Sequence, residues 1–329
     1  MIQRVDLNGF KSFGDTSIEL KKLTMLTGLN SSGKSSVIQA IEMAETYRRT
    51  GGRSFLLNKH GSEKELTNKS YNGFEIDVVS DGCTVHLDTD AGKSAIQGEM
   101  TDNIFYLEAG RIGGANSIEI YSEDSEIGSR GENVIKCIDA HWDDVLPQHI
   151  HHPESEGDTF LFNLKAWLNI ISPNVKFDYK VNELSDDSYS TYNGFRTSNV
   201  GFGLSYTLPV IAMLLRATLL PGSVVLLENP EAHLHPKGQT EMGKLIACAV
   251  KAGVQVIVET HSDHLFDGIR IFAKEDGHFS KDFIGYWFEL DAESITQWEN
   301  ILINDAGQLS KEAPQGFCDQ FEINAMQLI

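Results

Sequence analysis

The sequence has few cysteines and no long apolar run. Its four cysteines, Cys83, Cys137, Cys248 and Cys318, are scattered and form no C-x-x-C pair. Neither a zinc site nor a disulfide framework is therefore predicted. No run of eighteen apolar residues occurs, and the N-terminus alternates polar and apolar residues. These features predict a soluble, cytoplasmic protein with no membrane segment.

Positive charge is also scarce. The chain has 27 lysines and arginines against 47 aspartates and glutamates, which gives a formal net charge of −20. Proteins that coat nucleic acid by bulk attraction carry a basic surface, so that class is not favoured, although a local basic strip stays open. Hydrophobic residues make up 41% of the sequence, enough for a globular chain with a sizeable core.

Hydrophobic periodicity predicts antiparallel strands near the N-terminus and alternating strands and helices near the C-terminus. The expected N-terminal strands are 2–7, 17–20 and 23–27, with a hairpin over 74–87 around Ser80-Asp81-Gly82. From Leu208 onward we expect an apolar helix, a strand over 224–227, a helix over 236–252 and a strand over 254–259. Such alternation favours a parallel sheet with crossover helices.

The middle of the chain, residues 133–200, is expected to be mostly helical. Within it, HIHHPESEGD at 149–158 is interpreted as an exposed loop. Three histidines in four residues leave a metal site as the alternative. Two strands and an amphipathic end are expected beyond residue 282, with their aromatic side chains in the core.

GLNSSGKS, from Gly28 to Ser35, fits the phosphate-binding pattern G-x-x-x-x-G-K-[ST] in full. Its glycines let successive backbone N–H groups curl around an anion, and the following helix adds its positive end. Lys34 is expected to reach the outer phosphates of a nucleotide, and the Ser35 hydroxyl to ligate Mg²⁺. The candidate phosphate-binding residues are Gly28, Asn30, Ser31, Ser32, Gly33, Lys34, Ser35 and Ser36.

A P-loop needs an acidic partner on a neighbouring strand to hold magnesium. Glu228 follows the apolar run Val224–Leu227 and suits that task. The strand 254–259 leads to His261, again at the carboxyl edge where open α/β sheets place ligands. His261 is therefore a candidate γ-phosphate sensor.

A second glycine-rich segment, SNVGFGLSYTLP, precedes the apolar helix. Gly201, Gly203 and Ser205 stand at the expected helix start, where they could bind another anion. Because the P-loop already holds one nucleotide, this surface would serve the nucleotide of a partner.

These motifs together resemble the ABC-class ATPases of the OLD, SMC and recombination-repair clamp group. NGFKSFGD with TMLTGLNSSGKSSVIQAI resembles their N-terminal lobe, VGFGLS their signature, ENPEAHLHP their Walker B and D-loop, and ETHSDHL their switch histidine. Small standalone OLD-like ATPases, including subunits of bacterial anti-phage systems, are the most similar members. YLEAGR, from Tyr106 to Arg111, resembles a YLSAxR element of such proteins. Arg111 is interpreted as a contact to phosphate or to a dimer seam, or as a surface salt bridge.

The resemblance implies an α/β P-loop NTPase with an ABC-type head, which has a mixed sheet, an antiparallel β subdomain and a helical lobe. Residues 1–329 are expected to form one such head. Its nucleotide-binding core would comprise 1–110 and 206–290, its helical and signature lobe 111–205, and its tail 291–329, packed on the core.

Asn229 stands where an ABC-type ATPase has the glutamate that activates water. General-base assistance is worth roughly 10²–10⁴ in rate, so hydrolysis is expected to be slow. Glu231, two residues on, is a candidate replacement, although this outer glutamate also accompanies the base in the D-E-P-E pattern. Two mechanisms stay open: slow hydrolysis with Glu231 or His261 placing the water, and a nearly inert ATP sensor.

The resemblance implies ATP and Mg²⁺ as cofactors and an isologous dimer that sandwiches two nucleotides. The expected function is a dimeric ATPase that regulates a separate effector, a nuclease or toxin, in anti-phage defence. The alternative is an ATP-dependent structural or DNA-tethering module with little turnover, and DNA is a further candidate partner. A P-loop kinase fits the signature segment and His261 poorly.

Overall fold

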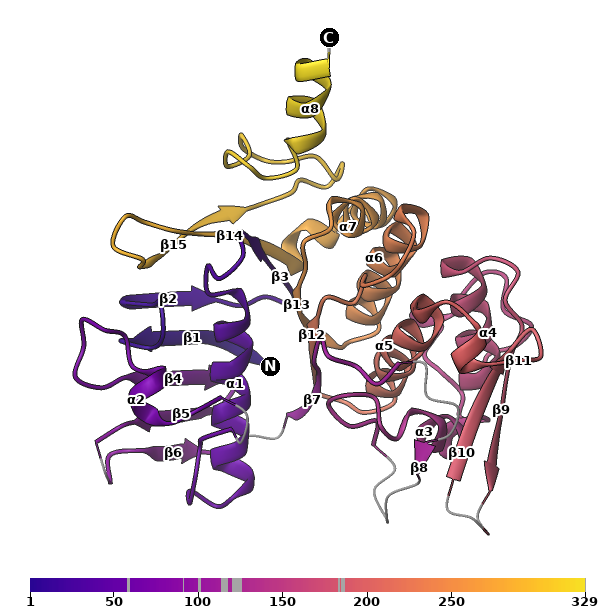
Figure 1. The fold of residues 1–329 in the computed structure, drawn as a ribbon, viewed down its shortest axis with the longest axis horizontal. Helices are drawn as coiled ribbons and strands as arrows, with labels where there is room; N and C mark the ends of the chain where they lie inside the picture. Colours follow the sequence, from indigo (N-terminus) through magenta and orange to yellow (C-terminus); the bar gives the residue numbers. More distant parts are fainter. Residues whose placement is uncertain are drawn as a thin grey trace. The chain divides into compact units, whose positions relative to one another are not determined.

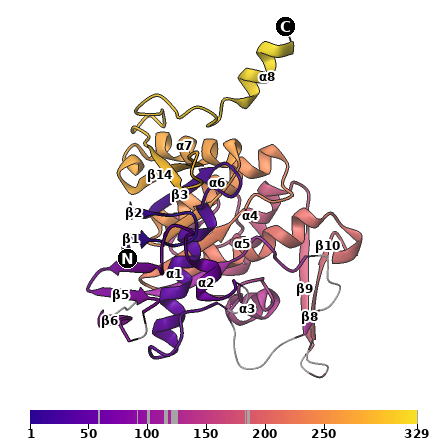
Figure 2. The same cartoon turned by 60° about the vertical axis from the view of Figure 1, so that its left-hand side comes forward.

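The computed structural model describes residues 1–57, 60–90, 92–99, 102–113, 118–119, 126–182, 184 and 187–328. The chain divides into two compact units. Unit 1 comprises 1–102 and 279–329, and unit 2 comprises 103–278. Figures 1 and 2 show the elements of both units.

Unit 1 contains a five-stranded antiparallel sheet in the order β2-β1-β4-β5-β6. Its strands are β1 (Ile2–Asn8), β2 (Asp15–Glu19), β4 (Glu75–Ser80), β5 (Cys83–Asp88) and β6 (Ala95–Gly98). Ser80 pairs with Cys83 across the expected hairpin, and Gly82 takes the positive φ of 80° that the turn needs. The predicted strand pair and hairpin are confirmed.

The second part of unit 1 surrounds the glycine loop. Strand β3 (Leu23–Gly28) lies parallel to β14 (Phe283–Leu290), which pairs antiparallel with β15 (Thr296–Ile301). The remaining elements are α1 (Lys34–Arg49), α2 (Glu63–Leu66), the 3-10 helix η3 (Phe279–Asp282) and α8 (Gln320–Leu328). Helix α1 packs against β1, β4 and β5 through its apolar face. The predicted aromatic core of the tail is confirmed for Tyr286, Trp287, Phe288 and Phe317, which are buried, whereas Trp298 is half-buried and the Phe321 side chain lies outside the described residues.

Unit 2 is built on three parallel strands, β7 (Asn103–Leu107), β12 (Ser223–Glu228) and β13 (Gln255–Glu259). Three helices accompany them: α5 (Phe202–Thr218), α6 (Pro236–Lys251) and α7 (Asp263–Asp276). Strand β13 is buried along its whole length, and β12 is buried up to Glu228. Such continuous burial explains their unbroken apolar sequences.

The rest of unit 2 corrects the expectation of a mostly helical middle segment. Two helices, α3 (Val134–His141) and α4 (Phe160–Ile171), are followed by an antiparallel hairpin of β9 (Phe177–Asn182) and β10 (Asp187–Tyr192). Shorter elements are β8 (Ile118–Glu119), β11 (Phe195–Arg196), η1 (Gln148–Ile150) and η2 (Thr197–Asn199). The signal for the hairpin was the alternation of Phe177, Tyr179 and Val181 among polar residues.

The histidine-rich segment 149–158 is not simply an exposed loop. His149 is exposed, but His152 is buried and meets the Trp167 ring edge-on at a centroid distance of 4.8 Å. His151 Nε2 lies 2.8 Å from the Leu146 carbonyl oxygen. Within the described ranges, no group of three or more His, Cys, Asp or Glu side chains is arranged to hold a metal. No described helix is both long and apolar enough to cross a lipid bilayer.

Helices α6 and α7 pack closely against each other at two glycines. A Cβ on Gly243 would lie 2.1 Å from the Leu265 carbonyl oxygen, and one on Gly268 would lie 2.0 Å from the Thr240 carbonyl oxygen. Both positions therefore require glycine, because any side chain would push backbone away from backbone.

We expect Gly268→Ala to destabilise the fold by about 1–3 kcal/mol, because the overpacking cost outweighs the helix-propensity gain of about 1 kcal/mol. Chemical denaturation measures the free energy of unfolding. Lys274→Ala, at an exposed position of the same helix, is the control and should stay within about 0.5 kcal/mol of the wild type. A variant G268A as stable as the wild type would contradict the close contact.

Candidate functional site

The phosphate-binding loop has the predicted strand, loop and helix order. Gly28 ends β3 with φ 135°, and a Cβ there would lie 2.1 Å from the carbonyl oxygen of Phe288 in β14. Gly33 precedes α1 with φ 104°, and its Cβ would lie 2.8 Å from both Phe13 and Thr296. Both glycines are thus required by the backbone conformation and by close packing.

Side chains of the loop donate hydrogen bonds to its own carbonyl oxygens. Lys34, only 3% exposed, donates from Nζ to the carbonyl oxygens of Gly28 (3.2 Å) and Leu29 (2.6 Å). The Ser32 hydroxyl donates to the same Leu29 oxygen at 2.7 Å. Because these carbonyl oxygens already have donors, they oppose a nearby anion less, and the backbone N–H groups of the loop can serve it.

The start of α1 also fits an anion. No side chain caps it, and no acidic residue stands in its first turn. The first N–H groups of a helix lack intrahelical acceptors, and the helix dipole is positive there. Among the predicted ligands, Asn30 and Ser31 are exposed, Ser35 is half-buried, and Ser32 and Ser36 are buried.

Thr296, at the start of β15, is a supporting residue that the sequence motifs did not reveal. Its Oγ1 lies 3.0 Å from the Ser32 carbonyl oxygen and 2.7 Å from Ser12 Oγ, and the residue is 3% exposed. The Thr296 hydroxyl therefore supports the glycine loop from a distant part of the chain. The only sign of this supporting role in the sequence is a polar residue at the start of an expected strand.

We expect Thr296→Val to weaken binding of a fluorescent ATP analogue about fivefold to thirtyfold, because it leaves the buried Ser32 carbonyl without a donor, at a cost of about 1–2 kcal/mol. Titration with the analogue measures the Kd. Gln297→Ala, on the exposed side of the same strand, is the matched control. Equal affinities for all three proteins would show that the hydroxyl does not support the loop.

The carboxylate of Glu228 is held at both oxygens by the segment 106–111. The Tyr106 hydroxyl donates to Oε1 at 3.0 Å, and the Ala109 backbone N–H donates to Oε2 at 3.1 Å. The YLEAGR element therefore positions this side chain. Glu228 is half-buried, and its remaining lone pairs can accept hydrogen bonds from a hydrated Mg²⁺.

Arg111 ends the same element and is buried, with 2% exposure, which excludes a surface salt bridge. Its NH1 donates to the carbonyl oxygens of Glu228 (2.8 Å) and Glu108 (3.2 Å), and its NH2 donates to that of Asn229 (2.7 Å). The guanidinium also lies 5.5 Å from the centre of the Tyr206 ring. Burial lowers the pKa of Arg111 to about 10, and the negative charge of Glu231 makes the largest contribution that opposes this decrease. The residue stays charged at neutral pH.

We expect Arg111→Lys to lower the free energy of unfolding by about 1–3 kcal/mol, because one ammonium cannot reproduce the planar fork that serves several carbonyl groups. The control is Arg130→Lys, since Arg130 is 46% exposed and pairs with Glu108 at 3.1 Å. Exposed pairs contribute about 0–1 kcal/mol. If both variants unfold at the same denaturant concentration, the Arg111 network does not stabilise this edge of the sheet.

The loop after β12 explains the asparagine at position 229. Asn229 has φ 44°, a left-handed conformation that asparagine tolerates better than most residues, and its N–H donates to the Glu259 carbonyl oxygen at 2.9 Å. Glu231, 7% exposed, accepts a hydrogen bond at Oε1 from the His261 backbone N–H at 3.1 Å. Glu231 thereby connects the loops that follow β12 and β13. The His261 residue itself is exposed.

The glycine-rich start of α5 packs on this loop. Gly201 is the exposed N-cap, with nothing within 4 Å of a Cβ, whereas a Cβ on Gly203 would lie 2.8 Å from the His233 carbonyl oxygen. The Tyr206 ring meets the His233 ring edge-on at 4.8 Å. Ser205 is 8% exposed, and its hydroxyl donates to the Phe202 carbonyl oxygen at 3.0 Å.

The predicted site residues thus fall into two groups. Gly28 and Asn30 to Ser36 lie in unit 1. Unit 2 contains Gly201, Gly203, Ser205, Glu228, Asn229, Glu231 and His261. The contacts described above bring Glu228, Asn229, Glu231, the His261 backbone and Gly203 together at the loop after β12.

Sequence comparison finds matches to two protein-family models, each over less than half of the chain. Residues 4–141 match the family described as AAA domain, and residues 122–266 match the family described as AAA ATPase domain. No curated protein matches the chain in sequence.

Solved structures with a similar fold include two SMC heads. One is the SMC head bound to the C-winged helix domain of ScpA, with 14% identity, TM-score 0.57 and coverage of 92% of this chain and 98% of that chain. The other is the SMC head with an extended coiled coil, bound to the C-terminal domain of ScpA derived from Pyrococcus furiosus. It has 14% identity, TM-score 0.55 and coverage of 92% of this chain and 96% of that chain. The chain therefore has an α/β P-loop NTPase fold that is similar to the ABC-type heads of SMC proteins.

Proposed function

We propose that the chain binds ATP and hydrolyses it slowly. The observation that carries this proposal is the loop from Gly28 to Ser35, whose glycines have no room for a side chain and whose helix starts without a cap. Lys34 would exchange its carbonyl partners for the outer phosphates, a short movement for a flexible side chain. Asn30, Ser31, Ser32 and Ser36 would contribute to the phosphate-binding loop around it.

Ser35 and Glu228 are the proposed magnesium residues. Bound Mg²⁺ would neutralise phosphate charge in the transition state. Ser35 presents a half-buried hydroxyl at the start of α1. Glu228 is oriented by Tyr106 and by the Ala109 N–H, so it would accept hydrogen bonds from metal-bound water without reorganisation.

The residue at position 229 is the reason to expect slow turnover. An amide cannot accept a proton from water, so Asn229 would orient the water without activating it. Glu231 is a poor replacement, since it is nearly buried and its Oε1 already accepts from the His261 N–H. We assign Glu231 to positioning of the two loops and His261 to sensing of the γ-phosphate.

We further propose that two copies close around two nucleotides and that this closure regulates a separate effector, a nuclease or toxin, in anti-phage defence. Support for the dimer comes from Gly201, which is exposed at the start of α5 and leaves its N-terminal N–H groups accessible to a second nucleotide. Gly203 and Ser205 would shape this surface from behind. The defence role rests on the resemblance to OLD-like ATPases.

The second candidate function is an ATP-dependent structural or DNA-tethering module. Asn229 specifically favours it, because a missing base prolongs the ATP-bound closed state. In this alternative the assembled dimer, with or without DNA, is the functional species and hydrolysis is incidental.

The test compares Lys34→Ala, Asn229→Glu and Asn229→Asp in single-turnover ATP hydrolysis. We expect Lys34→Ala to lose activity and at least one carboxylate at 229 to raise the rate about tenfold or more, because a general base contributes roughly 10²–10⁴. Asn229→Asp is the matched variant, since aspartate tolerates the left-handed backbone better than glutamate.

Sedimentation in ATP and in ADP measures the proposed dimer. We expect a dimer in ATP for the wild type and a monomer for Lys34→Ala. Dimers with no hydrolysis in any variant would favour the structural module, and a wild type that neither binds ATP nor changes mass would refute the proposal.

A further inference from the structure

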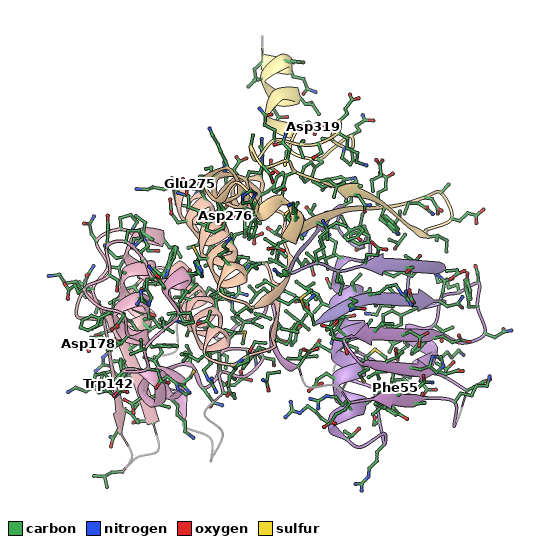
Figure 3. The ribbon with its side chains drawn as sticks, turned by 180° about the vertical axis from the view of Figure 1, so that it is seen from behind. Phe55, Trp142, Asp178, Glu275, Asp276 and Asp319 are labelled. Carbon is green, nitrogen blue, oxygen red and sulfur yellow. The ribbon has the colours of Figure 1, made fainter. Side chains whose placement is uncertain are left out.

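Unit 2 exposes three large apolar side chains that emerge from two adjacent segments. Trp142 is 51% exposed, Val145 63% and Phe162 43%. Single exposed apolar residues are ordinary, but a cluster of them marks an interaction site. Figure 3 labels Trp142 at the outer margin of the unit 2 ribbon in that view.

Backbone hydrogen bonds hold these two segments together. The Leu161 N–H donates to the Trp142 carbonyl oxygen at 3.1 Å, and the Phe160 N–H donates to that of Asp144 at 2.8 Å. An isolated bridge joins Val145 to Thr159. The three side chains are thus presented from a preorganised backbone, which lowers the entropic cost of binding.

A groove adjoins this cluster. It has a volume of about 590 Å³ and is lined in part by Glu154, Glu156, Phe162, Lys165, Lys176 and Phe177. The Phe162 ring lies over Gly157, where a Cβ would come within 2.7 Å of it. Gly157 therefore leaves the space that the ring occupies at the edge of the groove.

Carboxylates surround the cluster. The stretch from Cys137 to Leu164 contains no lysine or arginine. It contains Asp139, Asp143, Asp144, Glu154, Glu156 and Asp158, of which all except Asp144 are exposed. Asp144 is partly engaged, since His141 Nδ1 lies 2.6 Å from it. The nearest lysines in the groove lining are Lys165 and Lys176.

We propose that Trp142, Val145 and Phe162 form a docking surface for a basic, amphipathic segment of another protein. The apolar side chains would anchor the segment, and the surrounding carboxylates would attract its lysines and arginines. A second copy of a chain with net charge −20 would meet like charge here, as would nucleic acid. The surface shares no residue with the proposed ATP site, so docking would be a function in addition to the proposed ATP hydrolysis.

The test uses a fluorescent synthetic peptide that carries leucines on one helical face and lysines on the other. A peptide with glutamates in place of the lysines is its charge control. Fluorescence anisotropy measures the binding of each to the full chain without nucleotide. We expect the lysine peptide to bind and the glutamate peptide not to bind.

We expect the double variant W142S/F162S to weaken lysine-peptide binding about tenfold or more, as for hot-spot residues. Ile271→Ser, which changes an isoleucine of α7 that is 39% exposed, is the matched control and should bind like the wild type. Asp143→Lys with Glu156→Lys should also weaken binding and reduce its salt dependence. These exposed charge changes keep the test decisive if the double variant misfolds.

Three results would overturn the proposal. The first is unchanged binding in both the apolar and the charge variants, and the second is equal binding of the two peptides. The third is self-association of the wild-type chain that is lost in W142S/F162S, which would identify a second copy as the occupant. Because no nucleotide is present, each outcome is distinct from failure of the proposed ATPase.

Discussion

One buried cation, Arg111, organises the carboxyl end of β12 in unit 2. The Arg111 guanidinium donates to the carbonyl oxygens of Glu228 and Asn229, the two residues at which β12 turns into the following loop. It also faces the Tyr206 ring of α5. The conformation of the loop and the packing of α5 therefore depend on one charge. Removing such a charge would leave several buried carbonyl groups without donors, and these hydrogen bonds offset the cost of burying the guanidinium.

The glycine loop of unit 1 depends instead on close packing against its two glycines. At Gly28 the chain passes so close to Phe288 that only a hydrogen atom fits, and at Gly33 Phe13 and Thr296 fill the space that a Cβ would need. The two C-terminal strands are thus part of the phosphate loop's support. The loop is held by its neighbours before any ligand arrives, so binding requires less ordering.

Much of the fold could be predicted because its signals are local. The run from Leu23 to Ser36 places an apolar strand, a glycine loop and a helix in consecutive residues, and the structure confirms each of them. The supporting contacts could not be predicted in this way. Thr296 reaches Ser32 across 264 residues of sequence, and Arg111 reaches Glu228 across 117. A pattern read along the chain gives no sign of such pairs, since they form only when distant strands meet.

The hairpin of β9 and β10 was missed in the sequence for another reason. Its alternating Phe177 and Tyr179 stand among lysines, aspartates and asparagines, so the polar composition hid the period of two. His152 was misplaced because its burial depends on Trp167, a tertiary partner that propensity does not include. Asn229 could be recognised as unusual from sequence alone, but its positive φ came only with the structure.

The glycine contact between α6 and α7 has a mechanical consequence. Helices that touch backbone to backbone at Gly243 and Gly268 cannot slide past one another without separating. Their first turns are also joined, because the Ser262 hydroxyl donates to Gln239 Oε1 at 2.6 Å. The loops that lead into the two helices carry Glu231 and His261. We therefore expect the two loops to move together, because a displacement of one would be transmitted to the other through the packed helices.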